Sequence, residues 1–216
     1  MALLDLVLPP ACGSCGRAGR LLCDGCRSQL RAPTSEADRF QAADAGVVLG
    51  DALVLALAAF AYEGALRRAL QRLKYIGAAR MARPLAEAAA PVLRRLTDIS
   101  GPAVLVPVPV HIARQRERGY NQALLLAAEL GRLTGLAVDD LMLRPHATAK
   151  QHRLDRAGRL RNLRGAFAIR DDARPPPTVI VVDDILTTSA TLEACASVLR
   201  QAGVLHVHGF AIAREV

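Results

Sequence analysis

From residue 51 onward, short runs of apolar residues alternate with longer segments in which apolar residues recur at helical spacing. Strands that alternate with helices in this way pair in parallel, and the helices cover both faces of the sheet. The pattern therefore predicts an α/β domain, with a largely parallel sheet flanked by helices, over residues 51–216. The predicted strands are 53–62, 103–109, 178–182 and 204–213, and the predicted helices are 64–75, 82–96, 121–134 and 190–202.

The spacing of apolar residues also predicts which side of a helix is buried. In the helix at 64–75, three leucines fall on one face, and in the helix at 121–134, four apolar residues are expected to point inward. The two sets are Leu66, Leu70 and Leu73 in the first helix, and Leu124, Leu125, Ala128 and Leu133 in the second.

Residues 1–50 lack this alternation and divide near residue 31. Residues 1–31 contain closely spaced cysteines and glycines, whereas residues 32–50 are polar, acidic and irregular. A segment as short as the first buries too little apolar surface to fold unaided, so a bound metal would supply its folding free energy. We therefore expect a zinc-binding knuckle at 1–31, a connector at 32–50 and a main domain at 51–216.

Four of the five cysteines form two CxxC pairs, Cys12 with Cys15 and Cys23 with Cys26. Two such turns can supply four thiolates to a tetrahedral zinc ion, whereas a redox CxxC occurs singly before a helix. The motif therefore predicts a structural zinc site. The arginines around it fit a nucleic-acid contact and a clip against the main domain equally well. Cys195 stands apart in a predicted helix, where we expect a small buried apolar residue.

The basic residues are almost all arginine. The chain has 28 basic and 20 acidic residues, a net charge of +8, and its lysines are Lys74 and Lys150 alone. Guanidinium groups match pairs of phosphate oxygens, so the excess fits phosphorylated ligands or nucleic acid. A genome that favours arginine codons would give the same count. Charge alone therefore selects neither class of partner.

No apolar stretch reaches the roughly 18 to 20 residues that a membrane-spanning helix needs. The N-terminus carries an acid at Asp5, has no basic residue before its two prolines, and shows no secretory pattern. We therefore expect a cytoplasmic protein without a membrane span, in which cysteines stay reduced.

The segment 178–191 is predicted to be a strand, a turn and the start of a helix. Asp183 and Asp184 leave the most apolar strand of the chain at the sheet edge where ligands bind. Helix N-termini present N–H groups and flanking hydroxyls add donors, so the turn can grip a phosphate dianion. The carboxylates would then face a neighbouring sugar diol, with a magnesium ion near its oxygens. The residues expected to hold the phosphate are Thr187, Thr188, Ser189, Ala190 and Thr191.

Other interpretations of these acids explain less. A nucleotide-hydrolysing loop needs GxxxxGK[ST], and neither lysine has the required glycine before it. A nucleophilic aspartate does not account for the dense run of hydroxyls, which indicates a phosphate that is already present. Simple capping of a helix would require the remaining features to coincide by chance.

The segment resembles the phosphoribosyl pyrophosphate motif of type I phosphoribosyltransferases. The resemblance implies that the domain binds phosphoribosyl pyrophosphate with magnesium. Members of that family usually have glycine where this chain has Ser189. Serine keeps the backbone N–H and adds a hydroxyl, so we expect binding to survive with altered geometry.

A second polar segment follows the predicted strand at 103–109. Prolines fix the backbone there, and Arg114, Arg116 and Arg118 precede the predicted helix at 121–134. Their guanidinium groups could hold a second phosphate group, such as a leaving pyrophosphate. A solvated basic loop would give the same pattern.

A third polar segment, 148–167, is long and basic. Its composition fits a hood loop that closes over a ligand and excludes water. An ordinary surface loop fits the composition equally well. The candidate hood residues are Lys150, Gln151, Arg159 and Asn162.

Together these motifs resemble the ComF-like, or competence protein F, proteins with a phosphoribosyltransferase domain. The resemblance covers nearly the whole chain and rests on Pro9-Pro10 before the cysteine pairs, Tyr62-Glu63-Gly64, Lys74-Tyr75, Val106-Pro107-Val108-Pro109, the run from Arg116 to Gln122, the loop from Gln151 to Phe167 and the acidic segment. It implies a role in DNA uptake during natural transformation, beside a helicase-like partner. In an active transferase, Asp183 and Asp184 would be the catalytic residues. No motif in the sequence identifies the acceptor substrate. The alternative is a non-catalytic adaptor whose knuckle and arginine-rich loops hold single-stranded DNA.

Overall fold

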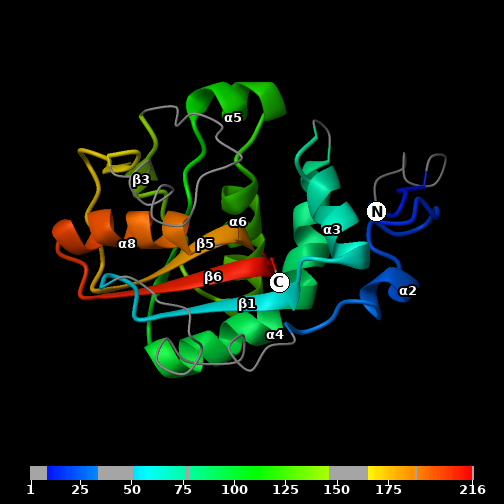
Figure 1. The fold of residues 1–216 in the computed structure, drawn as a ribbon, viewed down its shortest axis with the longest axis horizontal. Coiled ribbons are helices and arrows are strands. Elements are labelled where there is room, and N and C mark those ends of the chain that lie inside the picture. The colour runs from blue at the N-terminus through cyan, green and yellow to red at the C-terminus, as the bar shows by residue number, and fades with distance from the viewer. Residues whose placement is uncertain (1–8, 34–50, 76–77, 146–164, 188, 216) are drawn as a thin grey trace.

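The computed structural model describes residues 9–33, 51–75, 78–145, 165–187 and 189–215. Its centre is a four-stranded sheet in the order β1-β6-β5-β2, in which all neighbouring strands are parallel (Figure 1). The predicted α/β class is therefore confirmed. The strands are β1 (Leu55–Ala61), β2 (Val104–Pro107), β5 (Thr178–Leu186) and β6 (His206–Arg214).

Helices cover both faces of this sheet. α4 (Ala82–Ser100) and α6 (Gln122–Thr134) pack against one face, and α8 (Ala190–Gln201) packs against the other. Within the described part of the chain, no helix is both long and apolar enough to cross a membrane. The smaller elements are α2 (Asp24–Arg27), α3 (Gly64–Arg72), η2 (Ala79–Met81), α5 (Ile112–Arg118), β3 (Met142–Leu143) and β4 (Ala168–Ile169).

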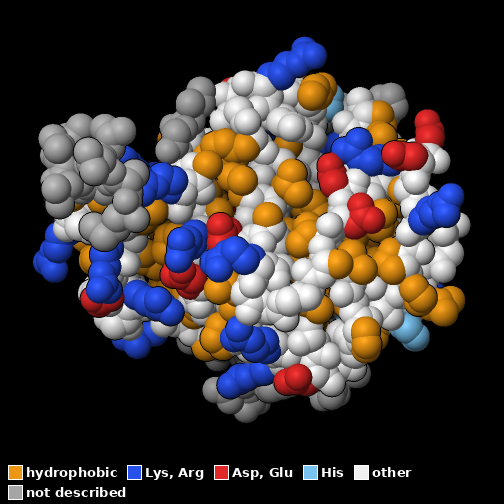
Figure 2. Space-filling model, turned by 180° about the vertical axis from the view of Figure 1, so that it is seen from behind, with side chains coloured by type: hydrophobic (Ala, Val, Ile, Leu, Met, Phe, Trp, Pro, Cys, Tyr) orange, Lys and Arg blue, Asp and Glu red, His pale blue; other side chains and the backbone are white. Residues whose placement is uncertain are grey.

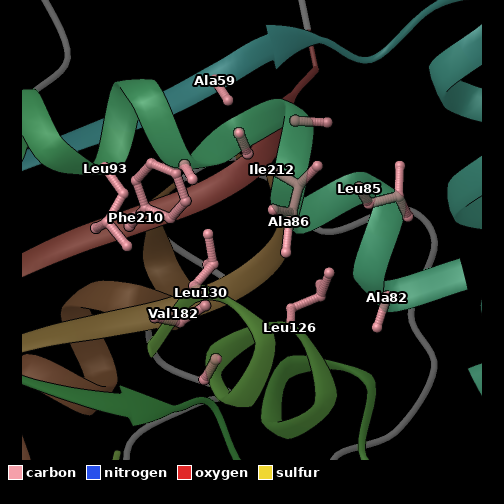
Figure 3. Close-up of a cluster of buried hydrophobic side chains, with 14 of the residues drawn as sticks. Ala59, Ala82, Leu85, Ala86, Leu93, Leu126, Leu130, Val182, Phe210 and Ile212 are labelled. Atoms are coloured by element: carbon pink, nitrogen blue, oxygen red, sulfur yellow. The ribbon is translucent and has the colours of Figure 1, made fainter. Parts of the chain in front are cut away.

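The larger core fills the space between the sheet and the layer of α4 and α6. Figure 3 shows Leu93 of α4 and Leu130 of α6 close to Phe210 of β6 and Val182 of β5. All four side chains are fully buried. Each stabilises the fold by about 1.5 to 3 kcal/mol relative to an exposed side chain. The core therefore fixes β5, which carries the predicted site, at the centre of the domain.

Two predicted details of these elements are wrong. β5 does not end at residue 182 but continues to Leu186, because Asp183 stays paired with Ala211 of β6. The two aspartates therefore belong to the end of a strand, not to a turn. In α6, Ala128 is exposed, because residues 123–128 are all apolar and their spacing selects no single face. The buried stripe of α6 instead contains Ala123, Leu126, Ala127 and Leu130.

The N-terminal segment 9–33 packs beside α3. Its buried residues form a small core with Ala65 of α3. Arg68 of α3 also donates to the carbonyl oxygen of Ser14 at 3.2 Å, and the Ala61 N–H at the end of β1 donates to the carbonyl oxygen of Arg31 at 2.9 Å. These contacts fasten the segment to the main domain. The predicted connector lies outside the described residues from 34 to 50, so the predicted division of the chain stays a prediction.

Candidate functional site

Two neighbouring carboxylates lie near the carboxyl end of β5. Asp184 is buried and Asp183 is half-buried. The Asp184 N–H donates a 2.8 Å hydrogen bond to Asp183 Oδ1. Burial raises the pKa of Asp183 well above its ordinary value of 3.8, and the charge of Asp184 raises it further. A cation is therefore needed if both groups are to stay ionised.

Lys74 supplies a cation at this place. Its Nζ lies 3.1 Å from Asp184 Oδ2, and its charge opposes the rise in the pKa of Asp183. The side chain of Lys74 is 31% exposed and that of Asp184 is 11% exposed, so water screens this ion pair less than a surface pair. The sequence reasoning missed the contact. The available signal was the presence of a lysine in a chain whose other basic residues, except Lys150, are all arginine.

Tyr120 ties the turn that carries Lys74 to the segment before α6. Its hydroxyl lies 2.7 Å from the carbonyl oxygen of Leu73 and 2.7 Å from that of Tyr75. Burial raises the pKa of the Tyr120 hydroxyl, although nearby Arg118 lowers it. The hydroxyl therefore stays a proton donor, and it holds the backbone on both sides of Lys74.

Two other polar residues of the same segment shape the backbone. Asn121 caps α6, because its Oδ1 accepts a 3.0 Å hydrogen bond from the Ala123 N–H. Its Nδ2 donates to the carbonyl oxygen of Val108 at 3.0 Å. His111 caps α5 by accepting from the Ala113 N–H at 3.2 Å. These residues fix the path between β2 and α6.

The start of α8 follows the carboxylates along the chain. Ser189 has a φ of 58° and is the one non-glycine residue with positive φ among those described. This left-handed conformation costs an L residue about 1 to 2 kcal/mol, but glycine adopts it freely. The predicted phosphate-binding residues near it differ in exposure: Thr187 is exposed, Ala190 is buried and Thr191 is half-buried. Thr188 lies outside the described residues.

The three arginines of the second polar segment lie in a helix, α5, and not in a turn before one. Residues four apart share a helix side, so Arg114 and Arg118 lie on one side and Arg116 lies away from them. Arg114 interacts with Arg144, while Arg118 lines a pocket with residues that follow α3. The helix was missed because α5 buries none of its residues and so shows no apolar stripe. Pyrophosphate binding by these arginines stays a prediction.

Arg144 is a further basic group near the carboxylates. Its Cζ lies 5.2 Å from the centre of the Phe167 ring. Burial lowers the pKa of Arg144, Arg114 lowers it further, and Asp183 acts in the opposite direction. Arg144 also lines a pocket of about 240 Å³. Nothing in the sequence sets Arg144 apart from the many other arginines.

The structure describes only 165–167 of the predicted hood segment. Phe167 in this part is buried in the second core. The hood candidates lie outside the described residues, so their role stays a prediction; they are Lys150, Gln151, Arg159 and Asn162.

The four predicted zinc ligands lie together. The Sγ atoms of Cys12, Cys15, Cys23 and Cys26 are all within 4.8 Å of one another, and those of Cys15 and Cys23 are 3.7 Å apart. Tetrahedral zinc with Zn–S bonds of about 2.3 Å requires S–S distances of about 3.8 Å. The cluster can therefore hold a structural zinc ion. Cys195 is buried in α8, as predicted.

The pKa values of Cys12 and Cys26 are shifted in opposite directions. Burial favours the neutral form of Cys12, but backbone N–H groups of Cys15 and Cys23 outweigh it and lower the pKa to about 6. The Ser14 hydroxyl favours the charged form of Cys26, but burial and the other thiols raise its pKa to about 12. Four thiolates at this distance need a divalent cation to stabilise their charge, which fits the zinc site.

The parallel sheet, its carboxylate pair and the N-terminal cysteine cluster define a class of protein. The fold is an α/β fold consistent with that of phosphoribosyltransferases, and the cluster adds a small segment that can hold a metal ion. The chain is 30% identical over 213 residues to Competence protein F of Haemophilus influenzae, an alignment that covers 95% of this chain and 85% of the relative. The chain therefore belongs to the competence protein F family.

Two further relatives match shorter parts. The DNA utilization protein YhgH of Salmonella typhimurium is 36% identical over 124 residues, which cover 57% of this chain and 54% of the relative. Competence protein ComFC of Bacillus subtilis is 34% identical over 100 residues, which cover 46% of this chain and 39% of the relative. No protein-family model matches the chain.

Proposed function

We propose that the chain binds phosphoribosyl pyrophosphate, with magnesium, at the carboxyl end of β5 and acts in DNA uptake. The observation that carries the proposal is the pair of Asp183 and Asp184, placed just before the left-handed Ser189 and the start of α8. The carboxylates would accept hydrogen bonds from the ribose hydroxyls. The N–H groups and hydroxyls of residues 187–191 would hold the 5-phosphate.

The donor set at this place fits magnesium, because two carboxylates and a sugar diol offer oxygen ligands to a hard cation. Bound magnesium would neutralise charge on the carboxylates and on the ligand. In a transfer reaction, the bond between C1 of the ribose and the pyrophosphate oxygen breaks, and a nucleophile of the acceptor attacks C1. The residues of this chain would orient the ribose and stabilise charge.

The role in DNA uptake is supported by the names of two relatives, Competence protein F and DNA utilization protein. The proposal includes a cytoplasmic location, since the cysteine cluster needs reduced thiols. A helicase-like partner stays a prediction.

Calorimetry with phosphoribosyl pyrophosphate and magnesium tests the ligand. Asp183→Asn should weaken binding at least tenfold, or about 1.4 kcal/mol, because it removes a charge that the ribose hydroxyls and the cation both use. Asp98→Asn is the matched control, since Asp98 is exposed near the end of α4, which leads to the amino end of β2. Equal affinity of wild type and Asp183→Asn, or no binding by wild type, would reject the proposal.

A second candidate function is single-stranded DNA binding. An open pocket of about 640 Å³ lies between the N-terminal segment and α3, and its described lining includes Arg68, Arg72 and Arg80 but no acidic residue. Tyr75 also lines it and is 70% exposed. Basic grooves with an exposed aromatic ring are typical of single-strand binding. On the face shown in Figure 2, basic side chains gather on the side that carries the N-terminal segment.

Binding of a labelled oligothymidylate, measured by anisotropy at several salt concentrations, tests this candidate. Tyr75→Ala should weaken binding five-fold or more, because stacking contributes about 1 to 3 kcal/mol per base. Arg72→Gln should make the salt dependence shallower by the loss of about one phosphate contact. Arg95→Gln, on the exposed side of α4, should change neither. Absence of binding at low salt would reject the adaptor.

A further inference from the structure

An open pocket of about 700 Å³ lies between the turn that follows α3 and the end of α5. Lys74 and Tyr75 line it from the first side, and Glu117 and Arg118 line it from the second. The last lining residue is Gln71 of α3. Figure 1 shows α5 at the top of the molecule and α3 below it to the right. Two basic groups from distant parts of the sequence therefore face one space.

Lys74 connects this pocket to the carboxylate pair. It lines the pocket, while its Nζ lies 3.1 Å from Asp184 Oδ2. An ammonium group has three N–H donors. One donor can remain on Asp184 while the others bind oxygens of a ligand in the pocket. A group that occupies the pocket would thus lie directly beside the proposed ribose site.

The charges select an anion with several oxygens. Lys74 and Arg118 carry two positive charges and Glu117 carries one negative charge, so the charged lining side chains are net positive. A guanidinium offers a planar fork of donors and an ammonium offers a compact charge, and the two suit neighbouring phosphate groups. A diphosphate offers oxygens to two cations at once.

Tyr120 gives Lys74 its position. The hydroxyl of Tyr120 lies 2.7 Å from each of the carbonyl oxygens on the two sides of Lys74, those of Leu73 and Tyr75, and shares its one proton between them. Tyr120 also lies close enough to Arg118 for its pKa to respond to that charge. One residue therefore sits beside both basic groups of the pocket.

We propose that Lys74 and Arg118 bind the diphosphate group of the ligand in this pocket, and that Tyr120 is a positioning residue for Lys74. The assignment rests on the proposed binding of phosphoribosyl pyrophosphate. It gives diphosphate binding to Arg118 and not to Arg116 of the same helix. It also adds Lys74, which lies in a different segment of the chain.

Calorimetry with inorganic pyrophosphate and, separately, with ribose 5-phosphate tests the assignment. Arg118→Gln should weaken pyrophosphate binding at least tenfold and change ribose 5-phosphate binding less than twofold. Lys74→Gln should also weaken pyrophosphate binding at least tenfold, and it should weaken ribose 5-phosphate binding by a smaller factor, because Lys74 also pairs with Asp184. Arg95→Gln, which removes an exposed arginine of α4, should change neither. Pyrophosphate binding that is unchanged in both variants, or that wild type lacks, overturns the assignment. Equal losses for both ligands overturn it too.

A double-mutant cycle tests Tyr120. Tyr120→Phe keeps the ring and removes the hydroxyl, so it should weaken pyrophosphate binding several-fold in wild type. It should have almost no further effect in Lys74→Gln, because the group that it positions is gone. Independent effects of the two changes would overturn the positioning role. Unfolding midpoints recorded for every variant show that the compared proteins are folded.

The two proposals fail in different ways. Wild type that binds pyrophosphate through Lys74 but has no affinity for phosphoribosyl pyrophosphate rejects the proposed function and keeps the pocket. Wild type that binds phosphoribosyl pyrophosphate with an affinity insensitive to Lys74→Gln and Arg118→Gln rejects the pocket assignment alone.

Discussion

Ser189 adopts a backbone conformation that glycine would adopt at lower cost. Its φ of 58° lies in the left-handed region, where contact between Cβ and the backbone is unfavourable. The side chain does not cap α8 through a hydrogen bond, so capping does not offset this cost. The left-handed backbone conformation at this position therefore explains why the phosphoribosyl pyrophosphate motif usually has glycine there. This chain adopts the same conformation with serine.

Ser189→Gly should raise the free energy of unfolding by up to about 1 kcal/mol, because relief of the left-handed strain exceeds the extra entropy of glycine in the unfolded chain. Urea denaturation followed by circular dichroism measures the change. Ser197→Gly, the same substitution within α8, should lower the free energy of unfolding by about 0.5 kcal/mol. A loss of stability in Ser189→Gly as large as that in Ser197→Gly would contradict this account.

The elements that the sequence predicted well are those with a strong apolar period. α4, α6 and α8 begin within one residue of their predicted starts, because each buries a stripe that its sequence displays. α5 buries no residue, and β3 and β4 have two residues each. Periodicity needs several buried positions, so these three elements leave no pattern to detect.

The candidate site was predictable to the extent that it is local in sequence. Asp183 and Asp184 stand out because they end an apolar run. The ion pair of Lys74 with Asp184 joins the turn after α3 to β5. The interaction of Arg144 with Asp183 joins the segment after β3 to the same strand. Such contacts depend on how helices and strands pack together, and the order of residues in a single chain does not display that packing.

At the scale of the whole molecule, the cysteine cluster lies in the N-terminal segment 9–33, which packs against the main domain. The segment meets α3 through Ala65 and Arg68 and meets the end of β1 through the hydrogen bond from Ala61 to Arg31. The sheet and its two cores contain none of the four clustered cysteines. Loss of the metal should therefore unfold the segment and leave the sheet folded.

Zinc analysis of the purified protein should give about one ion per chain. Cys12→Ser combined with Cys26→Ser should abolish zinc binding, because two of four thiolates are lost. The far-ultraviolet spectrum should keep most of its helical signal, while the thermal midpoint falls because contacts with α3 are lost. Cys195→Ala, which alters the cysteine outside the cluster, should retain zinc. A double variant that still holds one zinc per chain would refute the predicted ligand set.

Asn121 anchors the chain twice, at the α6 start and at the Val108 carbonyl. The segment that contains α5 therefore begins and ends close to Asn121, whose side chain binds the backbone at Val108 before α5 and at Ala123 after it. Substitutions at the exposed positions of α5 that are not proposed to bind a ligand should consequently leave β2 and α6 in place.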